Sequence, residues 1–308
     1  MKDFIYADIA LLTDSRFEDY TAPEGDWYYE NILHDDKLLQ DALKKRGFST
    51  TRIDWSRTGT NWSCFTCAVF RTTWDYFERI IDFYQWLNLA GKHTLLCNDI
   101  RLIHWNLDKH YLADLDHSGI PVIASQFIEK GIKPDFKKLL NDFGWKEAVI
   151  KPCVSGAARH TYRLNHQNFL EIQKIVHPLL TEESFILQPF IQDVVDTGED
   201  TLIVIDGKVT HAVRKVAKQG DFRVQDDHGG TVHPYTPTDE QVKLAELAIN
   251  ACKPTPVYGR VDMVRGNEGR WEVMELELIE PELWLRNYPP AAEVFADAII
   301  RYIENHQK

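Results

Sequence analysis

Hydrophobic and polar positions alternate in two different ways along this chain, and the change separates its first hundred residues from the rest. In the first part, short apolar runs alternate with long amphipathic stretches, which predicts strands connected by helices and therefore a parallel sheet. The predicted strands are residues 9–12, 49–53, 68–70 and 93–97, and the predicted helices are 28–46 and 74–89.

The rest of the chain is richer in predicted strands than in predicted helices. The pattern indicates a helix over 107–118, strands over 121–124, 147–152, 184–188, 201–205 and 209–215, and helices over 238–251 and 291–305. The strand over 147–152 leads into the small residues of 155–158, which predicts a mobile loop that can approach a ligand closely. The fold class is therefore α/β, with an α+β character in the later part.

A predicted β-hairpin carries acidic residues where a protein core is expected. Its strands are 259–264 and 271–280, and its turn contains two glycines. Successive side chains of a strand point to opposite faces, so Arg260 and Asp262 share one face of the first strand.

On the second strand, the same alternation places Glu275 and Glu277 on one face with Trp271 and Val273. We expect Asp262 to lie opposite Val273 and diagonal to Glu275, at roughly 7–8 Å. Three carboxylates this close repel one another unless a hard cation such as Mg²⁺ bridges them. The alternative is a half-exposed strand with its acids in water, but the apolar residues on the acidic face favour a covered surface.

Composition and charge narrow the functional classes. The chain has 308 residues, 44% of them hydrophobic, which is enough for two or three domains. Its net charge of -12, with no stripe rich in lysine and arginine, argues against nucleic acid as a partner. No signal peptide is recognisable, and no stretch approaches the roughly 20 apolar residues of a membrane span, so we expect a cytoplasmic protein with no membrane partner.

The cysteines predict neither a disulfide framework nor a metal site. Their number, five, is odd, and they are scattered along the chain. Cys64 and Cys67 form a lone C-x-x-C without a second pair, which favours a structural role over zinc binding or redox chemistry.

Two lysines are candidates for binding phosphate, although the chain contains neither a P-loop motif nor a dinucleotide-binding glycine motif. Lys151 ends an apolar strand just before the loop of small residues, where it can hold a phosphate as a point charge. Lys109 lies near a predicted helix start. Taken singly, each lysine is more often structural than functional.

The order of these motifs resembles the ATP-grasp superfamily. The motifs are 107–110, 118–122, Val-Ile-Lys-Pro at 149–152, Gln-Pro-Phe-Ile at 188–191, Gly-Glu-Asp at 198–200, Gly-Arg-Val-Asp at 259–262 and Glu-Leu-Glu at 275–277. The resemblance implies the ATP-grasp fold, with an N-terminal pre-ATP-grasp α/β domain over 1–98. A central subdomain over 99–186 and a C-terminal subdomain over 187–308 would enclose the nucleotide.

The resemblance also implies roles for individual residues. Lys109 and Lys151 are similar to the lysines that contact the ATP phosphates, and Ser155 and Gly156 belong to the loop that closes over them. Gln188, Phe190 and Ile191 are similar to the hinge, where the backbone of Phe190 and Ile191 would bind adenine. Glu199 is similar to the carboxylate that binds the ribose hydroxyls. Asp262, Glu275 and Glu277 are similar to the metal ligands, and Arg260 to the arginine that stabilises a tetrahedral oxyanion.

Two departures from the family pattern stand out. Many relatives have asparagine where this chain has Glu277, so metal affinity or metal number can differ. The loop after Lys151 is poorer in glycine than in many relatives. Segments 70–76, 211–215, 220–225 and 277–281 resemble the branch that contains the cycloserine-forming cyclo-ligase and glutathione-synthetase-like proteins.

The resemblance implies an ATP-dependent carboxylate-amine ligase that uses ATP and Mg²⁺, with Mn²⁺ as a substitute. Such an enzyme converts a small carboxylic or amino acid to an acylphosphate, releases ADP, and lets an amine displace phosphate. Arg260 would be catalytic by stabilising the oxyanion, an effect worth roughly 3–4 kcal/mol for one donor. Lys151 would be catalytic by offsetting the charge of the ATP phosphates. The alternatives are a small-molecule kinase on the same fold and a non-catalytic ATP or metal sensor. A homodimer is a reasonable expectation for this family.

Further basic residues are candidates for binding the substrate. Arg214, Lys215 and Arg223 follow the hinge and could bind a second carboxylate or the leaving phosphate. Arg71 could reach the same cleft from the first domain. Ordinary surface charge is the competing interpretation for Arg214, Lys215 and Arg223.

Overall fold

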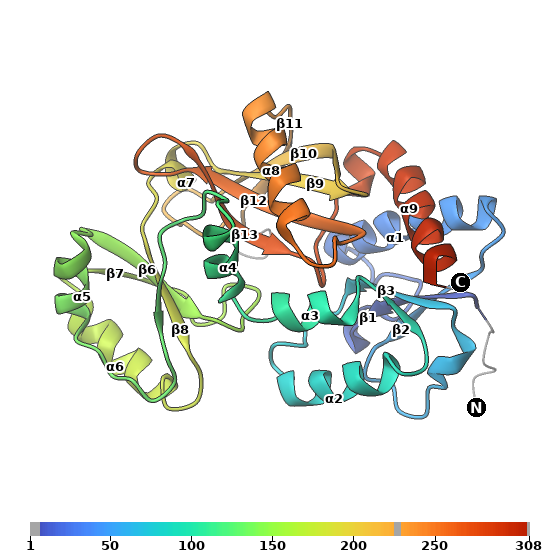
Figure 1. Cartoon of the computed structure of the whole chain (residues 1–308), viewed down its shortest axis with the longest axis horizontal. Coiled ribbons are helices and arrows are strands. Elements are labelled where there is room, and N and C mark those ends of the chain that lie inside the picture. The colour runs from blue at the N-terminus through green and yellow to red at the C-terminus, as the bar shows by residue number, and fades with distance from the viewer. Residues whose placement is uncertain (1–6, 225–228, 307–308) are drawn as a thin grey trace.

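The computed structural model describes residues 7–224 and 229–306 and contains three sheets arranged along an elongated molecule (Figure 1). The N-terminal sheet has the order β2-β1-β3-β4, and all its pairs are parallel, as predicted. Its strands are β1 (Ile9–Thr13), β2 (Thr50–Asp54), β3 (Cys67–Thr72) and β4 (Leu95–Cys97). Short 3-10 helices cover Ser15–Phe17, Trp62–Cys64 and Leu285–Asn287.

Helices cover both faces of the N-terminal sheet. Ile9 and Leu11 pack in one cluster with residues of α1 (Trp27–Lys45), whereas Ala10 and Leu12 pack in another with residues of α2 (Ile80–Ala90). This is the alternation expected of a strand buried on both faces. Helix α2 begins later than predicted, because residues 74–79 form turns.

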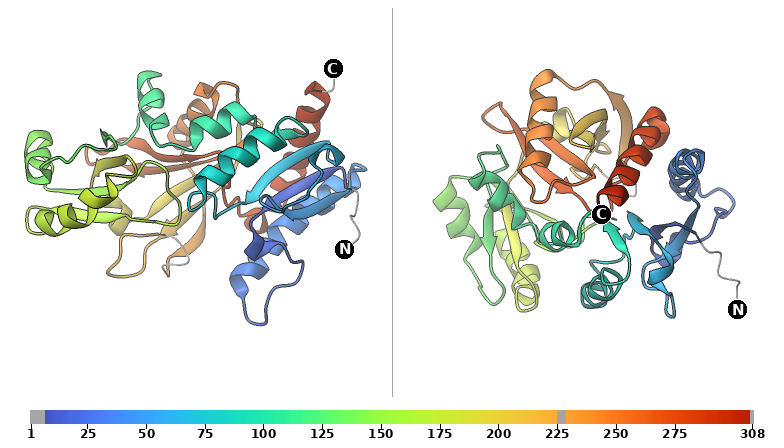
Figure 2. Two further views of the ribbon diagram at one scale, coloured as in Figure 1. Left: turned by 90° about the horizontal axis from the view of Figure 1, so that it is seen from below. Right: turned by 45° about the vertical axis from the view of Figure 1, so that its right-hand side comes forward.

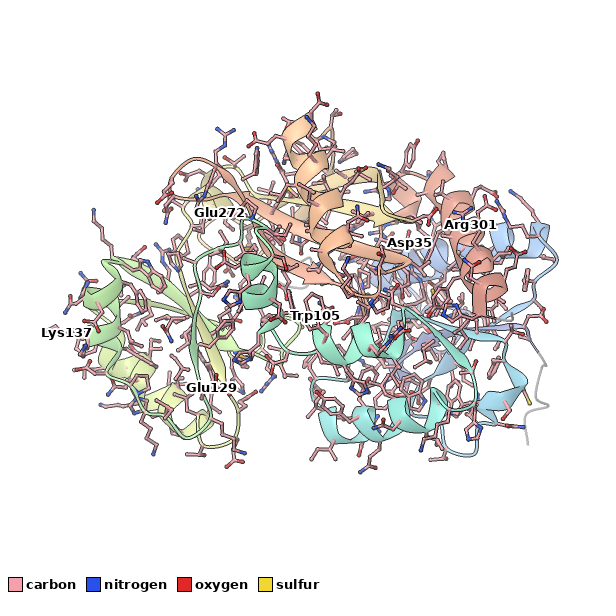
Figure 3. The ribbon with its side chains drawn as sticks, viewed as in Figure 1. Asp35, Trp105, Glu129, Lys137, Glu272 and Arg301 are labelled. Atoms are coloured by element: carbon pink, nitrogen blue, oxygen red, sulfur yellow. The ribbon has the colours of Figure 1, made fainter. Side chains whose placement is uncertain are left out.

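The C-terminal helix α9 (Pro290–His306) returns to the N-terminal domain and lies beside α1 (Figure 1). Phe295 and Ile299 share one hydrophobic cluster with residues of α1 and of the large sheet. Asp35 of α1, labelled in Figure 3, accepts a hydrogen bond from the Arg286 side chain at 2.9 Å. The first and last segments of the fold are thus packed together.

The large sheet is antiparallel and has the order β11-β10-β9-β12-β13. Its strands are β9 (Glu199–Ile205), β10 (Lys208–Val216), β11 (Thr231–Tyr235), β12 (Tyr258–Arg265) and β13 (Trp271–Glu277). Leu202, Val204 and Met263 pack with residues of α8 (Asp239–Ala251), α3 (Ile100–Asn106) and α4 (Tyr111–His117). On the opposite face, the charged residues Glu199 and Asp262 line a cavity, whereas Ile203 and Ile205 pack in the cluster of the N-terminal domain.

The third sheet is also antiparallel, has the order β5-β8-β6-β7, and lies at the far end of the molecule from the N-terminal sheet (Figure 2). It consists of β5 (Gln126–Ile128), β6 (Glu147–Pro152), β7 (Tyr162–Asn165) and β8 (Phe185–Pro189), with α5 (Phe136–Phe143) and α6 (Phe169–Leu179) packed on it. Helix α7 (Asp193–Asp196) then leads to the large sheet.

Two sequence predictions in this region need correction. Residues 121–124 form no strand: Val122 makes only an isolated bridge to Val273. The predicted boundary after residue 186 falls inside β8, whose pairing with β5 and β6 continues to residue 189.

Asn98 joins the N-terminal domain to the large sheet. Its side-chain amide donates to the carbonyls of Tyr258 (2.8 Å) and Leu278 (2.9 Å), and its oxygen accepts from the Val257 amide (2.7 Å). Asn98 is completely buried, so water cannot replace its side chain as the partner in these hydrogen bonds. Among the described helices, none is both long and apolar enough to cross a membrane.

Candidate active site

A cavity of about 480 Å³ is lined by residues of the large sheet, of the third sheet and of the N-terminal domain outside its sheet. Lys151 comes from β6, Glu199 from β9, Asp262 from β12 and Glu275 from β13, while Trp74 comes from the N-terminal domain. Every residue predicted to bind nucleotide or metal lines this cavity.

The acidic hairpin forms, but with a different register from the one predicted. Asp262 lies directly opposite Glu275, and Val273 lies opposite Met263, because a β-bulge falls between these pairs. The bulge adds one residue to β13 and turns Val273 away from the acidic face. Trp271 and Val273 therefore pack in the core beside α8 and do not cover the acids, contrary to the prediction.

Asp262 is buried and fully hydrogen-bonded. Its Oδ1 accepts from Thr201 Oγ1 (2.8 Å) and Arg260 Nε (3.0 Å), and its Oδ2 accepts from Arg260 Nη2 (2.8 Å) and Lys215 Nζ (3.0 Å). Although burial raises the pKa of Asp262, Arg260 and Lys215 hold it well below its usual range. Arg260 also pairs with Glu277, and Lys215 with Glu199.

Glu275 lies between the two predicted phosphate lysines. Its Oε1 is 3.1 Å from Lys109 Nζ and its Oε2 is 4.0 Å from Lys151 Nζ. Burial raises the pKa of Glu275, but the two lysines outweigh it and lower the value to about 2. Burial lowers the pKa of Lys151, while Glu275 more than offsets burial for the closer Lys109, whose pKa is raised.

The remaining two acids are harder to ionise. Burial raises the pKa of Glu277 well above its usual range, despite Arg260. Burial likewise raises the pKa of Glu199 to about 7, despite Lys215.

The donor set of Asp262, Glu275 and Glu277 fits a hard cation, because Mg²⁺ prefers carboxylate oxygens. In this structure the positive charge comes from Lys109, Lys215 and Arg260, which occupy the acids' oxygens. A bound cation would therefore have to displace protein hydrogen bonds at Asp262.

The loop of small residues closes one end of the cavity. Lys109 Nζ donates to the Ser155 carbonyl at 2.9 Å, which ties this lysine to the loop. Ala157 and Ala158 have positive φ angles of 47° and 53°, a left-handed backbone conformation that glycine adopts more readily. A Cβ added to Gly156 would lie 2.5 Å from the Phe77 ring.

The predicted hinge lines the cavity, but the two backbone positions differ. Phe190 N–H donates to the Glu147 carbonyl (2.9 Å) and its carbonyl accepts from Asn267 Nδ2 (3.2 Å), so both of its backbone groups are engaged. Among the described residues, none accepts a hydrogen bond from Ile191 N–H. The Gln188 side-chain amide donates to Ser125 Oγ at 3.0 Å.

The four basic residues predicted to bind substrate separate into two pairs. Lys215 and Arg223 line the cavity. Arg214 does not, because it follows the strand alternation to the opposite face, where it pairs with Asp200 at 2.6 Å. Arg71 is buried in the N-terminal domain against Asp36, at 2.8 Å, and does not reach the cavity either.

Several lining residues were not predicted from the sequence. The N-terminal domain contributes aromatic side chains, and the segment after β13 contributes further acids and a tryptophan; these are Phe17, Tyr28, Trp74, Tyr76, Glu280, Glu282 and Trp284. Burial raises the pKa of Glu280 to about 7, against the lowering effect of Tyr76 and Lys109. Trp284 has φ 44° and ψ 44°, and its ring lies 5.4 Å from the Arg260 guanidinium.

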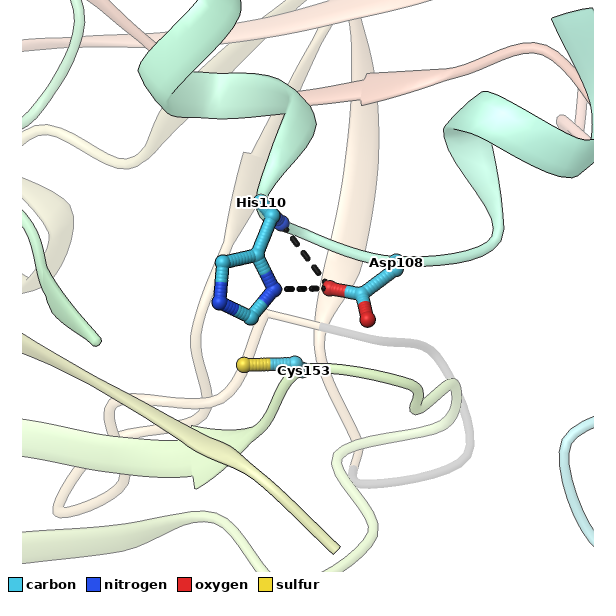
Figure 4. A group of neighbouring side chains, drawn as sticks. All are labelled: Asp108, His110 and Cys153. Atoms are coloured by element: carbon cyan, nitrogen blue, oxygen red, sulfur yellow. Dashed lines mark hydrogen bonds and ion pairs between the residues drawn. The ribbon is translucent and has the colours of Figure 1, made fainter. Parts of the chain in front are cut away.

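Asp108, His110 and Cys153 form a separate polar group (Figure 4), and none of the three lines the cavity. His110 Nδ1 is 2.5 Å from Asp108 Oδ1, and its Nε2 is 3.0 Å from Glu129 Oε1. The buried Cys153 thiol belongs to the same group, and the Cys153 carbonyl accepts from the Lys109 amide at 2.9 Å. This group holds the Lys109 segment against the strand that carries Lys151.

Two known protein families match this chain. Residues 9–98 match the family model of the N-terminal domain of D-cycloserine synthetase DcsG, and residues 120–280 match that of the RimK-like ATP-grasp domain. The chain is 32% identical, over 87% of its length and 93% of the relative's, to the cycloserine biosynthesis protein DcsG of Streptomyces lavendulae.

Solved structures share the fold of this chain. The crystal structure of D-cycloserine synthetase DcsG matches with a TM-score of 0.84 and 29% identity, covering 96% of this chain and 99% of that one. D-alanine-D-alanine ligase from Bacillus anthracis matches in fold with a TM-score of 0.66 and 16% identity, covering 97% and 98% of the two chains.

Proposed function

Because the chain belongs to the RimK-like ATP-grasp family, with a DcsG-type N-terminal domain, we propose that it is an ATP-dependent carboxylate-amine ligase that closes a ring within one amino acid. The observation that carries this proposal is the cavity in which Lys109, Lys151, Arg260 and the carboxylates of the hairpin converge. A carboxylate and a triphosphate are both anionic, and the lysines and the arginine of this cavity are the groups that can bind them.

The proposed reaction has two steps. A carboxylate oxygen of the substrate attacks the γ-phosphorus of ATP, and ADP leaves. A nitrogen then bonds to the carboxyl carbon and releases a proton, while phosphate leaves with the former carboxylate oxygen. Asp262, Glu275 and Glu277 would hold an Mg²⁺ ion, which would neutralise charge on the phosphates when bound.

The chain's own residues act at defined positions in this scheme. Lys109 and Lys151 turn from Glu275 to the phosphates, since both lie at the same carboxylate before ATP arrives. Arg260 is placed to stabilise the oxyanion that forms when the nitrogen attacks. The loop 155–158 excludes water, because Lys109 already links it to the phosphate end of the cavity.

The nucleotide contacts are part of the same proposal. Ile191 N–H takes the adenine edge, because the backbone groups of Phe190 are engaged elsewhere. Glu199 takes the ribose hydroxyls, and Lys215 and Arg223 bind the substrate or the leaving phosphate. A homodimer and a cytoplasmic location stay predictions.

Ring closure is favoured over joining two molecules by the extent of the match to the DcsG relatives, which includes the N-terminal domain. D-cycloserine contains one ring amide, between a carboxyl carbon and a nitrogen carried by the side-chain oxygen of a serine skeleton. Opening that bond on paper gives 2-amino-3-(aminooxy)propanoate, so this acid and its N-carbamoyl derivative are the first substrates to test.

The test measures ATP consumption with Mg²⁺ and either acid, separates ADP from AMP, and identifies the product by mass. We expect ADP, phosphate and a cyclic product, all abolished in Glu275→Gln. Formation of AMP would contradict the acylphosphate step, and a stable phosphoester would indicate a kinase. ATP binding without turnover of these acids or of pooled amino acids would contradict ligation.

A further inference from the structure

Nearly every acidic side chain that lines the cavity is matched by a basic side chain of the protein itself. Asp262 and Glu277 pair with Arg260, Glu275 with Lys109, Glu199 with Lys215, and Glu282 with Arg286. These pairs leave the cavity nearly balanced in charge at the end where ATP and its phosphates are proposed to bind.

Glu280 is the exception among the lining acids that are shielded from solvent. Within the described residues, no lysine, arginine or histidine forms an ion pair with its carboxylate. Its neighbour is the Tyr76 hydroxyl, and its backbone carbonyl accepts from Trp74 Nε1 at 3.0 Å. The other lining acid without such a pair, Glu78, is exposed to water.

The wall next to Glu280 is aromatic. The Trp74 ring lies 5.5 Å from Phe17 and 5.8 Å from Tyr28, and all three line the cavity together with Tyr76. A carboxylate beside aromatic rings is a favourable environment for an ammonium group, because both the charge and the ring faces attract a cation.

We propose that Glu280, with Trp74 and Tyr76, forms the subsite that binds the α-ammonium group of the amino-acid substrate. This inference rests on the proposed function and assigns one end of the substrate to one side chain. Recognition through Glu280 makes the enzyme selective for an α-amino acid over the same carboxylic acid without its amino group.

The substrate nitrogen that binds at Glu280 is the one that stays protonated, and the other nitrogen attacks the acylphosphate. An attacking nitrogen must be neutral, and a carboxylate at hydrogen-bond distance would stabilise its protonated, unreactive form. An aminooxy nitrogen is weakly basic and therefore neutral near pH 7, whereas an α-amino group is protonated. One molecule of 2-amino-3-(aminooxy)propanoate thus contains a nitrogen of each kind.

The position of Glu280 suits this assignment. It lies close enough to Lys109, Arg260 and Glu275 for their charges to act on it. An α-ammonium bound there would bring the adjacent substrate carboxylate toward Arg260 and the phosphate end of the cavity. The aromatic wall contributed by the N-terminal domain then covers the side of the substrate away from ATP.

The experiment compares 2-amino-3-(aminooxy)propanoate with 3-(aminooxy)propanoate, which lacks only the α-amino group. Calorimetry measures the affinity of the full-length protein for each acid in the presence of Mg²⁺ and a non-hydrolysable ATP analogue. We expect the native protein to bind the amino acid roughly tenfold to a hundredfold more tightly, the range expected for one hydrogen bond to a charged group. In Glu280→Gln this preference falls to near one.

The matched control is Glu282→Gln, which removes an acid from the same cavity that is already paired with Arg286 at 2.7 Å. Its preference for the amino acid should stay close to that of the native protein. Thermal unfolding of both variants checks that each is folded. If Glu280→Gln fails to fold, Trp74→Leu, which removes the aromatic face beside the ammonium, takes its place and should reduce the same preference.

Three outcomes would overturn the proposal. One is an equal affinity of the native protein for the two acids, including no binding of either. Another is an undiminished preference in Glu280→Gln. The third is an equal loss of turnover rate on both acids with unchanged affinities, which would make Glu280 a general base. Failure of the proposed function is seen separately, as binding of the amino acid without formation of ADP from ATP.

Discussion

Replacing Arg260 by alanine tests whether protein charges stand in for a cation at the acidic hairpin. Arg260 makes two hydrogen bonds to Asp262, at 3.0 and 2.8 Å, and pairs with Glu277. Removing one partner of a buried ion pair costs about 3–5 kcal/mol. The lower end applies, because Lys215 still neutralises Asp262 and the Glu277 side chain is 23% exposed.

A loss of about 3 kcal/mol corresponds to a fall in Tm of roughly 6–12 °C, at about 2–4 °C per kcal/mol for a large domain. We expect this fall when Arg260→Ala is unfolded thermally without divalent cations. Addition of MgCl₂ without nucleotide should then restore much of the lost stability, because the freed oxygens of Asp262 and Glu277 can bind Mg²⁺. The native protein should respond much less, since Arg260 occupies those oxygens.

The control is Arg265→Ala, on the same strand but exposed and stacked on Trp271 at 5.3 Å. It should lose little stability and show the native response to MgCl₂. An equal response of Arg260→Ala and the native protein to MgCl₂ would refute the reasoning, as would an unchanged Tm of Arg260→Ala in the absence of the cation.

Three further predictions concern residues around the site. Asn98→Asp replaces an amide that donates two buried hydrogen bonds by a group that cannot donate them when ionised, so we expect a loss of about 2–5 kcal/mol in urea unfolding; an unchanged midpoint would contradict it. Gly156→Ala places a methyl 2.5 Å from Phe77 and should raise KM for ATP severalfold with little change in Tm, so an unaltered KM would argue against loop closure. Burial lowers the pKa of His110, but hydrogen bonds to Asp108 and Glu129 raise it overall. The charged imidazole therefore stabilises the fold fully at low pH, and this contribution is lost as pH rises through the raised pKa. His110→Gln should flatten the dependence of Tm on pH between about 6 and 8, and parallel curves for the variant and the native protein would contradict this.

The fold was predictable where local pattern and burial agree. The strands at 9–12 and 68–70 are apolar on both faces and were recognised because a parallel sheet buries both. Helices α5 and α6 were not predicted; they lie in a stretch where polar residues and prolines interrupt the apolar positions. Residues 121–124 are apolar enough for a strand, but they pair with another strand only through the isolated bridge between Val122 and Val273.

The acids of the site could be found from the sequence because strand alternation is a local property. Their register could not, since the bulge between the Asp262–Glu275 and Met263–Val273 pairs is not visible in the hairpin's own pattern. The same alternation, applied one residue further along β10, separates Arg214 from Lys215.

The aromatic part of the cavity escaped prediction for another reason. Trp74 and Glu280 are 206 positions apart in the chain and meet only when the N-terminal domain docks on the large sheet. In the sequence, Trp74 and Tyr76 resemble core residues, and nothing local distinguishes an aromatic side chain that lines a cavity from one that fills a core.

The return of α9 to the N-terminal domain has a consequence for synthesis on the ribosome. One face of the N-terminal sheet, with Ile9 and Leu11, is completed by α1 and by Phe295 and Ile299 of α9. That face stays partly uncovered while the whole ATP-binding portion is translated, and it can be sealed only after α9 emerges. A nascent chain stalled before α9 would therefore expose apolar surface at its beginning, which makes its first domain a target for chaperones until the last helix is made.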